Sequence, residues 1–542
     1  MGNRISITIE HEKSLLKLYS RQKLEELNPG DIVRFSAYIE PSRGAVTPSG
    51  HEFSKFHYFA NIRATGRIVG EVQVIQATKH KPIFWIIRRK IHKKLKYNLP
   101  EIHAEIAAAL TIGKKDGINN NVIATFRKSG TFHLLAISGL HMGLVGLFFF
   151  ALFRRSCTLS EYLTLRYDIK KISAFAGIAS SLFYLQISCG QVSAQRACIM
   201  TCTFFLSILI DRKPDIFRST TLAAIILIVL YPENIFKPGF QMLFFAVSGI
   251  CSCTSNNHDT LFRPTLKKKI LGNFSHLHNP SEKKPGHYLI RKTLVTLSRL
   301  LVYTGKIAKI SIFATAATSP FVIYHFHYFS LTGIFANAVA IPVTTFLIIP
   351  TLIAILASMP ICDSHTLYIL LEIEIESLIR LMEAFNRLNF GYTDIHGFSG
   401  MTLLLISFGT LILLIGKTSK KYYGIAIITV GGMLIKHSEL PDIFISEKNI
   451  AIPGYNDSTY FLNARNAPKN FTARNWSQYL GDYRNTVSHS DNPEIEKTDQ
   501  SSYLYRKNGK VILIDYNSQN PEQKQRYVFS NHAENRLGLD VR

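Results

Sequence analysis

The chain has 542 residues, a net charge of +25 and a mean hydropathy of +0.11. A soluble protein this basic rarely has a positive mean hydropathy, so the average indicates long apolar runs between polar, basic stretches. These values exclude an ordinary cytosolic enzyme, a disordered chain and a small disulfide-linked scaffold. The net charge is +11 in residues 1–131, +14 in residues 132–437 and zero in residues 438–542. A polyanionic partner is therefore expected at the front and middle of the chain.

Residues 1–83 predict a small β domain. Asp31–Glu40 alternates apolar and polar residues, and Asn61–Gly70 and Glu71–Ala77 predict two further strands, with Gly66 and Gly70 as breaks. Short strands, turns and one long basic loop favour a compact barrel that is OB-like.

Residues 84–131 are expected to form amphipathic and linker helices. The segment 84–97 (FWIIRRKIHKKLKY) predicts a basic amphipathic helix. Two interpretations stay open for it. It lies on a membrane surface, or its cations contact nucleic-acid phosphates.

Residues 132–437 predict a polytopic membrane domain. Residues 132–153 contain no Asp, Glu, Lys or Arg, and as one helix they would reach about 33 Å, enough for a bilayer core. Shorter apolar runs lie at 172–189, 197–210, 219–231, 239–253, 307–329, 334–357, 401–416 and 422–435. We expect eight to ten membrane segments, several of them tilted, broken or buried. Residues 366–385 instead predict an interfacial or buried amphipathic helix, because three glutamates interrupt the apolar pattern.

Basic loops orient this domain. Cations flank the loops at 154–171, 212–218 and 254–306, which the positive-inside rule makes cytoplasmic. The front region is then external. Translocating a basic domain without a preceding membrane segment is unfavourable, so we expect upstream membrane helices that this sequence does not contain.

Residues 438–542 are polar, with strand-like pieces at 442–452, 458–463 and 510–516. The expected fold is thus a mainly α membrane protein. A polytopic helical bundle follows a small OB-like β-barrel and precedes a small α/β or β-rich tail.

Polar residues inside the apolar runs are candidates for function. His133, Ser138 and His141 lie in the first run and are expected near one helix face. Arg196 and Gln241 each lie early in a later run. Polar groups at membrane depth are unfavourable unless they face a partner or a wet cavity. Interhelical hydrogen bonds, or snorkelling for the arginine, are the alternative interpretations.

Prolines in the later apolar runs are a further indication of a functional site. Asn337 lies in an apolar run, and Pro320 and Pro342 are expected to break their helices. Broken helices commonly surround a transport path.

Four of these segments, HLLAISGLHMGL, VSAQRACIM, GFQMLFFAVSGI and TSP…NAVAIP, resemble the ComEC family of DNA-uptake competence membrane channels. The similarity extends from about residue 28, at NPGDIVRFSAYIEP, to about residue 435. It implies a channel component that passes one strand of incoming DNA across the cytoplasmic (inner) membrane. The matching polar positions, as candidates for the transport path, are His133, Ser138, His141, Arg196, Gln241 and Asn337.

The family's OB-like domain would receive the DNA. Cations interleave with aromatic residues in this part of the chain, as phosphate attraction and base stacking require. For each residue alone, core packing or a solvated charge is the alternative. The candidates are Arg34, Phe35, Tyr38, Arg43, Lys55, Phe56, Tyr58 and Arg63.

The departures from the family limit the expected chemistry. Many members end in a metallo-β-lactamase-like nuclease domain, whose HxHxDH metal cluster is absent from this sequence. We therefore expect no catalytic residues, metal site or cofactor. The sequence also has no GxxxxGK[ST] loop, so the expected partners are a cytoplasmic ATPase or helicase, DNA-receptor proteins, the lipid bilayer and further copies of the chain. A small-solute transporter and a truncated, non-functional remnant are the alternative functions.

Overall fold

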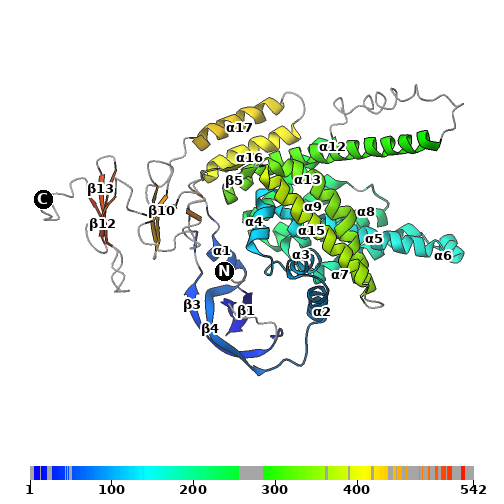
Figure 1. Ribbon diagram of the computed structural model, residues 1–542, viewed down its shortest axis with the longest axis horizontal. Helices are drawn as coiled ribbons and strands as arrows, with labels where there is room; N and C mark the ends of the chain where they lie inside the picture. Colours follow the sequence, from blue (N-terminus) through cyan, green and yellow to red (C-terminus); the bar gives the residue numbers. More distant parts are fainter. Residues whose placement is uncertain are drawn as a thin grey trace. The chain divides into compact units, whose positions relative to one another are not determined.

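The computed structural model describes two compact units, each considered by itself. It describes residues 5–436 except 12–13, 21–26, 43, 46, 48–49, 51, 138, 214, 256–284, 360–363, 389–390 and 417–419. Beyond 436 it describes 444–446, 449–453, 459–461, 475–476, 479, 486–488, 495–497, 502–507, 510–515 and 526–530. Most described residues lie in helices (Figure 1). The division of the chain at 83, 131 and 437 stays a prediction.

The front of the chain forms a four-stranded sheet (Figure 1). Its strands are β1 (Ile5–His11), β2 (Ser14–Ser20), β3 (Ile32–Pro41) and β4 (Ile62–Gln76), in the order β1-β2-β4-β3. β2 pairs with β4 in parallel and the other pairs are antiparallel. Among the described strands the sheet is open, with β1 and β3 at its edges, so the OB-like barrel stays a prediction.

The prediction of two strands in residues 61–77 is wrong, because β4 is continuous through both glycines. Gly66 pairs with Leu18 on one side and Ile39 on the other. A Cβ at Gly66 would collide with the carbonyl oxygen of Tyr38. This glycine is therefore needed for a close approach between strands.

Many helices contribute to the main apolar core, and four of them lie outside the apolar runs of the sequence. α2 (Ile83–Asn98) confirms the predicted amphipathic helix. α3 (Glu101–Ile112) is buried from Ala104 to its end at Gly113, whose φ of +74° favours glycine. α4 (Asn120–Lys128) and α15 (His365–Arg387) complete this group. α15 buries one face in the core, so residues 366–385 form a buried amphipathic helix.

The first apolar run is not one helix, so the prediction of a continuous segment over 132–153 is wrong. A short 3-10 helix, η1 (Phe132–Leu135), comes first. Ala136 then has extended backbone angles, and α5 spans Gly139–Cys157. Large apolar side chains on α5, such as Leu147 and Phe153, are about half exposed.

The following apolar runs are helical, as expected. They are α7 (Ile169–Ile187), α8 (Val192–Leu209), α9 (Ile216–Leu230) and α10 (Pro238–Ser255), with the short α6 (Glu161–Arg166) and η2 (Pro232–Phe236) between them. α5 packs against α7 and α8, and α10 packs against α12 (Pro285–Phe326). These helices surround the polar residues discussed below.

Neither proline breaks its helix, which corrects a second expectation. α12 continues through Pro320, and the Ser319 hydroxyl donates to the carbonyl of Ala316, whose usual amide donor the proline lacks. α13 (Thr332–Val343) contains Pro342 and passes into a π-helical turn, η4 (Thr344–Ile348), before α14 (Ile349–Ser358). The chain adapts locally to each proline.

The last described helices are α16 (Gly400–Ile415) and α17 (Lys420–Lys436), which pack together. In the second unit, β7 (Phe444–Ser446), β8 (Asn449–Pro453), β9 (Thr459–Phe461) and β10 (Thr486–Ser488) form one small sheet. A second sheet contains β11 (Ile495–Lys497), β12 (Ser502–Lys507), β13 (Lys510–Asp515) and β14 (Arg526–Ser530). The strands predicted here are confirmed, although 442–452 is a hairpin of two strands.

Within the described ranges, three helical segments are long and apolar enough to cross a bilayer: Gly139–Cys157, Ile307–Phe326 and Thr332–Ser358. Shorter apolar helices are Ser193–Leu209, Arg218–Leu230, Pro238–Cys253, Gly400–Leu414 and Lys421–Ile435. Eight to ten crossings therefore stay a prediction.

Candidate functional site

One face of the front sheet combines cations with aromatic rings. Strand pairing places Tyr38 of β3 opposite Arg67 of β4, and Arg67 opposite Tyr19 of β2. Paired residues share a face of a sheet, so a row of tyrosine, arginine and tyrosine crosses three strands. Lys17 Nζ lies 5.9 Å from the centroid of the Tyr19 ring. Tyr38 is 68% exposed, which leaves its ring available for stacking.

The predicted strand residues divide between the two faces. Arg34 and Tyr38 lie on the same, exposed side of β3. Arg63 and Arg67 are likewise both exposed on β4, an even number of positions apart. Phe35 points to the opposite, half-buried side of β3. The structure thus places Arg34, Tyr38 and Arg63 on the surface that carries Arg67.

Three predicted residues lie on α1 (Phe53–Phe59) and not on a strand. Lys55 Nζ lies 3.8 Å from the centroid of the Phe236 ring, in a cation–π contact. Phe56 is half-buried and Tyr58 is exposed. Lys55 therefore already has an aromatic partner within the protein. Arg43 lies outside the described residues.

Sequence reasoning missed Lys17, Tyr19 and Arg67. Lys17 and Tyr19 belong to the segment SLLKLYS, in which they alternate with the buried Leu18. That alternation was the signal for an additional strand. Arg67 was inside an expected strand, but only the pairing shows that it lies between two tyrosines.

The first polar group of the membrane region is split by the break before α5. His133 lies in η1 and is exposed, whereas His141 lies in the first turn of α5 and is 2% exposed. The expectation that they lie near one helix face is wrong, because no single helix holds both. Ser138 lies outside the described residues.

His141 lines a small cavity with residues from three other helices. The cavity has a volume of about 20 Å³, which is room for one water molecule. Its wall includes Thr111 of α3, Tyr184 of α7 and Leu352 of α14. Tyr184 donates its hydroxyl to the carbonyl of Leu110 at 3.1 Å. This cavity is too small to be a passage for a nucleic acid.

Arg196 is a buried cation on α8, and only 5% of it is exposed. Its Nη1 donates to the carbonyl oxygen of Gly239 in the first turn of α10, while its Nε is buried without a hydrogen-bond partner. Among the described residues, no ion pair includes Arg196. The positive charge is therefore held in the interior without an acidic partner in the part of the chain that the structure describes.

Gln241 lies on the same first turns of α10 as the acceptor of Arg196. Its Nε2 donates to the carbonyl of Ile235 at 2.9 Å, and its Oε1 lies 2.8 Å from His325 Nε2 of α12. The side chain thus ties α10 to α12. Arg196 and Gln241 are brought to one end of α10, as members of a polar group that also includes His325.

Asn337 is buried in α13, and its Oδ1 has no hydrogen-bond partner among the described residues. Thr344 and Thr345 follow about two turns later and are also buried. Thr351 of α14 donates to Glu374 Oε1 of α15 at 3.0 Å. Burial raises the pKa of Glu374, although the Thr351 hydrogen bond opposes that shift. Buried polar groups therefore continue along this helical segment.

A buried ion pair joins α2 to α3. Glu105 is 3% exposed, and its Oε1 lies 3.3 Å from His92 Nε2 and 3.2 Å from Lys96 Nζ. Burial by itself raises the pKa of Glu105, but the hydrogen bonds and charges of His92 and Lys96 lower it to about 2. The carboxylate therefore remains ionised and fixes the basic helix to the core.

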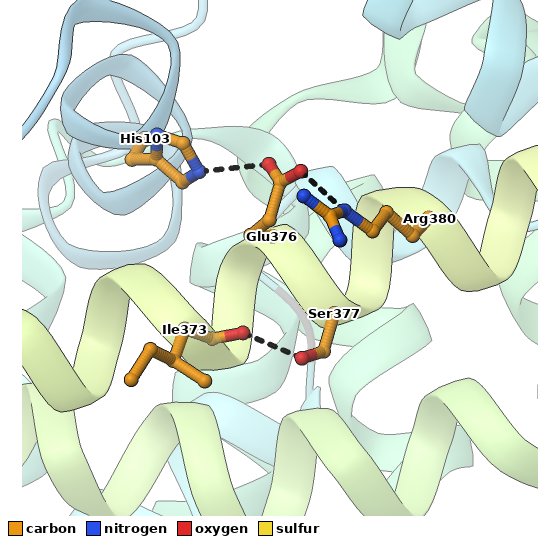
Figure 2. Close-up of polar contacts among 5 residues, drawn as sticks. All are labelled: His103, Ile373, Glu376, Ser377 and Arg380. Atoms are coloured by element: carbon orange, nitrogen blue, oxygen red, sulfur yellow. Dashed lines mark hydrogen bonds and ion pairs between the residues drawn. The ribbon is translucent and has the colours of Figure 1, made fainter.

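A second carboxylate joins α3 to α15 (Figure 2). Glu376 Oε2 lies 3.1 Å from His103 Nε2 of α3, and its Oε1 accepts from Arg380 Nε at 2.7 Å. The Arg380 hydrogen bond lowers the pKa of Glu376 most, burial opposes it, and His103 adds to the lowering. Glu376 is more exposed than Glu105, so its pair is more strongly screened by solvent.

Comparison with known proteins places this arrangement in a family. The family described as Competence protein matches residues 110–420, more than half of the chain. The chain belongs to the Competence protein family. The match includes α5, Arg196, Gln241 and Asn337.

A curated relative agrees with this assignment. ComE operon protein 3 of Bacillus subtilis (strain 168) is 24% identical over 366 residues, which cover 65% of this chain and 40% of the relative. The chain therefore spans less than half of the length of that relative. No solved structure matches the chain. Family membership and three apolar helices of spanning length identify a membrane protein.

Proposed function

We propose that this chain acts in DNA uptake during competence, as a multi-pass channel component that guides one DNA strand across the cytoplasmic membrane. It performs no covalent chemistry in this role. Family membership supports a part in competence. The channel activity, the single-stranded substrate and the location in the cytoplasmic membrane are part of what we propose.

Arg196 is the observation that carries the proposal. A buried charge without a counter-ion is unfavourable by several kcal/mol in proteins, on the order of the stability of a small domain. Polar and charged groups at membrane depth commonly mark ion or substrate pathways. A phosphate backbone passing near α8 and α10 supplies the missing negative charge. The interior position of Arg196 is then explained by transport and not by stability.

The front sheet supports the same substrate. Its exposed face presents Arg34, Arg63 and Arg67 beside Tyr38, which suits phosphate attraction and base stacking without sequence preference. We propose this face as the first contact for the strand. Its external position follows from the charge of the loops.

Exposed apolar side chains support several crossings. Phe175 of α7, Phe204 of α8, Ile225 of α9 and Leu404 of α16 are each at least 40% exposed. Lipid contact removes such side chains from water. The shorter helices then cross with tilt or lie among the three longer ones. A cytoplasmic ATPase or helicase would supply the driving force, and DNA-receptor proteins and further copies of the chain are proposed partners.

The test is flux into liposomes that contain the full chain. We expect fluorescent single-stranded DNA to enter when trapped nucleic-acid-binding protein holds it inside, and Arg196→Ala to reduce that entry at least tenfold, with partial rescue by Arg196→Lys. Exposed Arg212→Ala is the matched control and should leave entry unchanged. Entry of small solutes without DNA would replace the proposal with a solute transporter. Equal DNA entry through Arg196→Ala would overturn the role of this residue.

A further inference from the structure

The basic helix α2 has its apolar face covered by protein. Ile91 and Leu95 are buried in the main core, and Phe84 and Ile87 pack against the same core. An interfacial helix needs that face to enter the lipid. The packing therefore weighs against the membrane-surface interpretation and leaves the polar face to be explained.

The outward face of α2 is a narrow exposed stripe. Ile86, Lys90, Lys93 and Tyr97 recur at i, i+4, i+7 and i+11, so they lie on one side of the helix. All four are exposed, and Tyr97 is 88% exposed. We call these four residues the outer stripe of α2.

Neighbouring cations of α2 have partners within the protein, but the stripe cations form no ion pair with a described residue. Lys94 Nζ donates to the carbonyl of Met359 at 3.2 Å, and Lys96 pairs with Glu105. In the described part of the chain, no salt bridge includes Lys90 or Lys93. The sequence from residue 72 to residue 100 contains no Asp or Glu. As far as the described residues go, the stripe is therefore a positive surface without a paired acid and with an aromatic ring at one end.

The outer stripe begins beside the front sheet. Arg89 Nη1 donates to Asn28 Oδ1 at 2.8 Å, in the turn that leads into β3. Asp31 in that turn accepts from the amide of Thr78, which follows β4, at 2.8 Å. These bonds connect the start of α2 to both strands that carry Tyr38 and Arg67.

We propose that the outer stripe of α2 binds the phosphate backbone of single-stranded DNA and stacks one base on Tyr97. This inference rests on the proposed function and adds a second contact between the sheet and the helices. Lys90 and Lys93 are three positions apart on the helix, so their Cβ atoms lie about 5–6 Å from each other, and their long side chains can reach neighbouring phosphates of one strand. Tyr97 follows one turn further on.

The experiment measures binding of a fluorescent thymidine oligomer to the purified full chain in nanodiscs at several salt concentrations. Lys90→Gln with Lys93→Gln should make the slope of log affinity against log salt shallower by about 1.4, at about 0.7 per phosphate contact. Tyr97→Ala should weaken binding by about fivefold or more at every salt concentration, and Tyr97→Phe should restore it. Arg154→Gln with Arg155→Gln, which changes two exposed cations on α5, is the charge-matched control.

Two results overturn the inference in different ways. In the first, the salt slope is unchanged in the Lys90→Gln, Lys93→Gln variant, while Arg63→Gln with Arg67→Gln loses affinity for the oligomer. The outer stripe then does not bind DNA, but the sheet contact and the proposed function stand. No binding by the unaltered chain removes both.

A lipid partner is tested with Trp85 on α2 as the reporter, after Trp476→Phe removes the other tryptophan. If Trp85 emission changes with anionic nanodiscs but not with the oligomer, and Lys90→Gln, Lys93→Gln abolishes that change, the stripe binds lipid and the inference is wrong. A change with the oligomer in neutral nanodiscs supports it.

Discussion

The front sheet and the helical region both carry positive charge, but they hold it in opposite ways. Arg67 lies on an exposed sheet face between two tyrosines, whereas Arg196 is buried between α8 and α10 with no acidic partner among the described residues. Water solvates the first charge and the protein must accommodate the second. A surface charge thus contributes to the rate of encounter and to salt dependence, while a buried charge persists despite the free-energy cost of its desolvation.

The strongest test of this contrast is Arg196→Met. Within α10, the Gly239 carbonyl keeps its place as a helix acceptor, so removing the guanidinium does not leave that oxygen unpaired. Replacing buried ion pairs by apolar residues of similar volume is often neutral or stabilising, by about 1–4 kcal/mol, and we expect the same direction for a buried cation that has no ion pair among the described residues. We expect the melting temperature in detergent to stay equal or rise while DNA entry falls at least tenfold. A lower melting temperature with normal entry would make Arg196 a structural residue.

Glu105→Gln examines a buried charge that does have partners. Loss of the carboxylate leaves His92 and Lys96 beside a neutral group, and we expect unfolding free energy to fall by about 3 kcal/mol. The pKa of Glu105 is lowered to about 2, so its contribution is complete above the unfolded pKa near 4.5 and is lost as the pH falls toward 2. Thermal melting from pH 6 to pH 3 should decline more steeply in the unaltered chain than in the variant. Parallel declines would contradict this assignment.

Glu376→Gln examines the intermediate case. Its carboxylate pairs with His103 and Arg380 (Figure 2) but is partly exposed, so we expect a loss below about 1 kcal/mol. The lowered pKa has the same sign of effect, with stability lost on acidification. Chemical unfolding at low and high salt measures it, because screening should reduce the difference between the two chains. If Glu376→Gln lowered the unfolding free energy as much as Glu105→Gln, solvent exposure would not determine how much each carboxylate contributes to stability.

Arg67→Gln should change stability least. The side chain is exposed, so the melting temperature should remain the same, while the salt slope for single-stranded DNA becomes shallower by about 0.7. Titration of the full chain with labelled oligomer measures that slope. Ser36→Gln, a neighbouring exposed position on β3, is the neutral control. An unchanged slope would remove Arg67 from the proposed interface.

Hydropathy predicted most helices of the middle region because apolar composition alone determines those runs. α7, α8, α9, α10, α16 and α17 each coincide with a predicted run. It failed at residues 132–137, where apolar side chains continue through η1 and an extended residue. A hydropathy average over a window of residues does not detect a change in backbone conformation when the residues on both sides of it are apolar.

The candidate site was predictable in its residue types and not in its contacts. Arg196 was identifiable as a cation at the start of an apolar run, but its acceptor is a backbone carbonyl 43 positions away. Tyr19 and Arg67 became visible only through strand pairing. Glu105 and Glu376 were not singled out, since nothing local showed that His92 and His103 lie beside them. Long-range packing decides each of these partners.

The length of α12 has a mechanical consequence. A helix of 42 residues extends about 63 Å, roughly twice the hydrocarbon thickness of a bilayer. Once the apolar stretch Ile307–Phe326 crosses, the preceding 22 residues form a rod of about 33 Å that projects beyond the lipid. Any force applied to the far end of that rod would be delivered directly to His325 and, through its contact with Gln241, to the helix end beside Arg196.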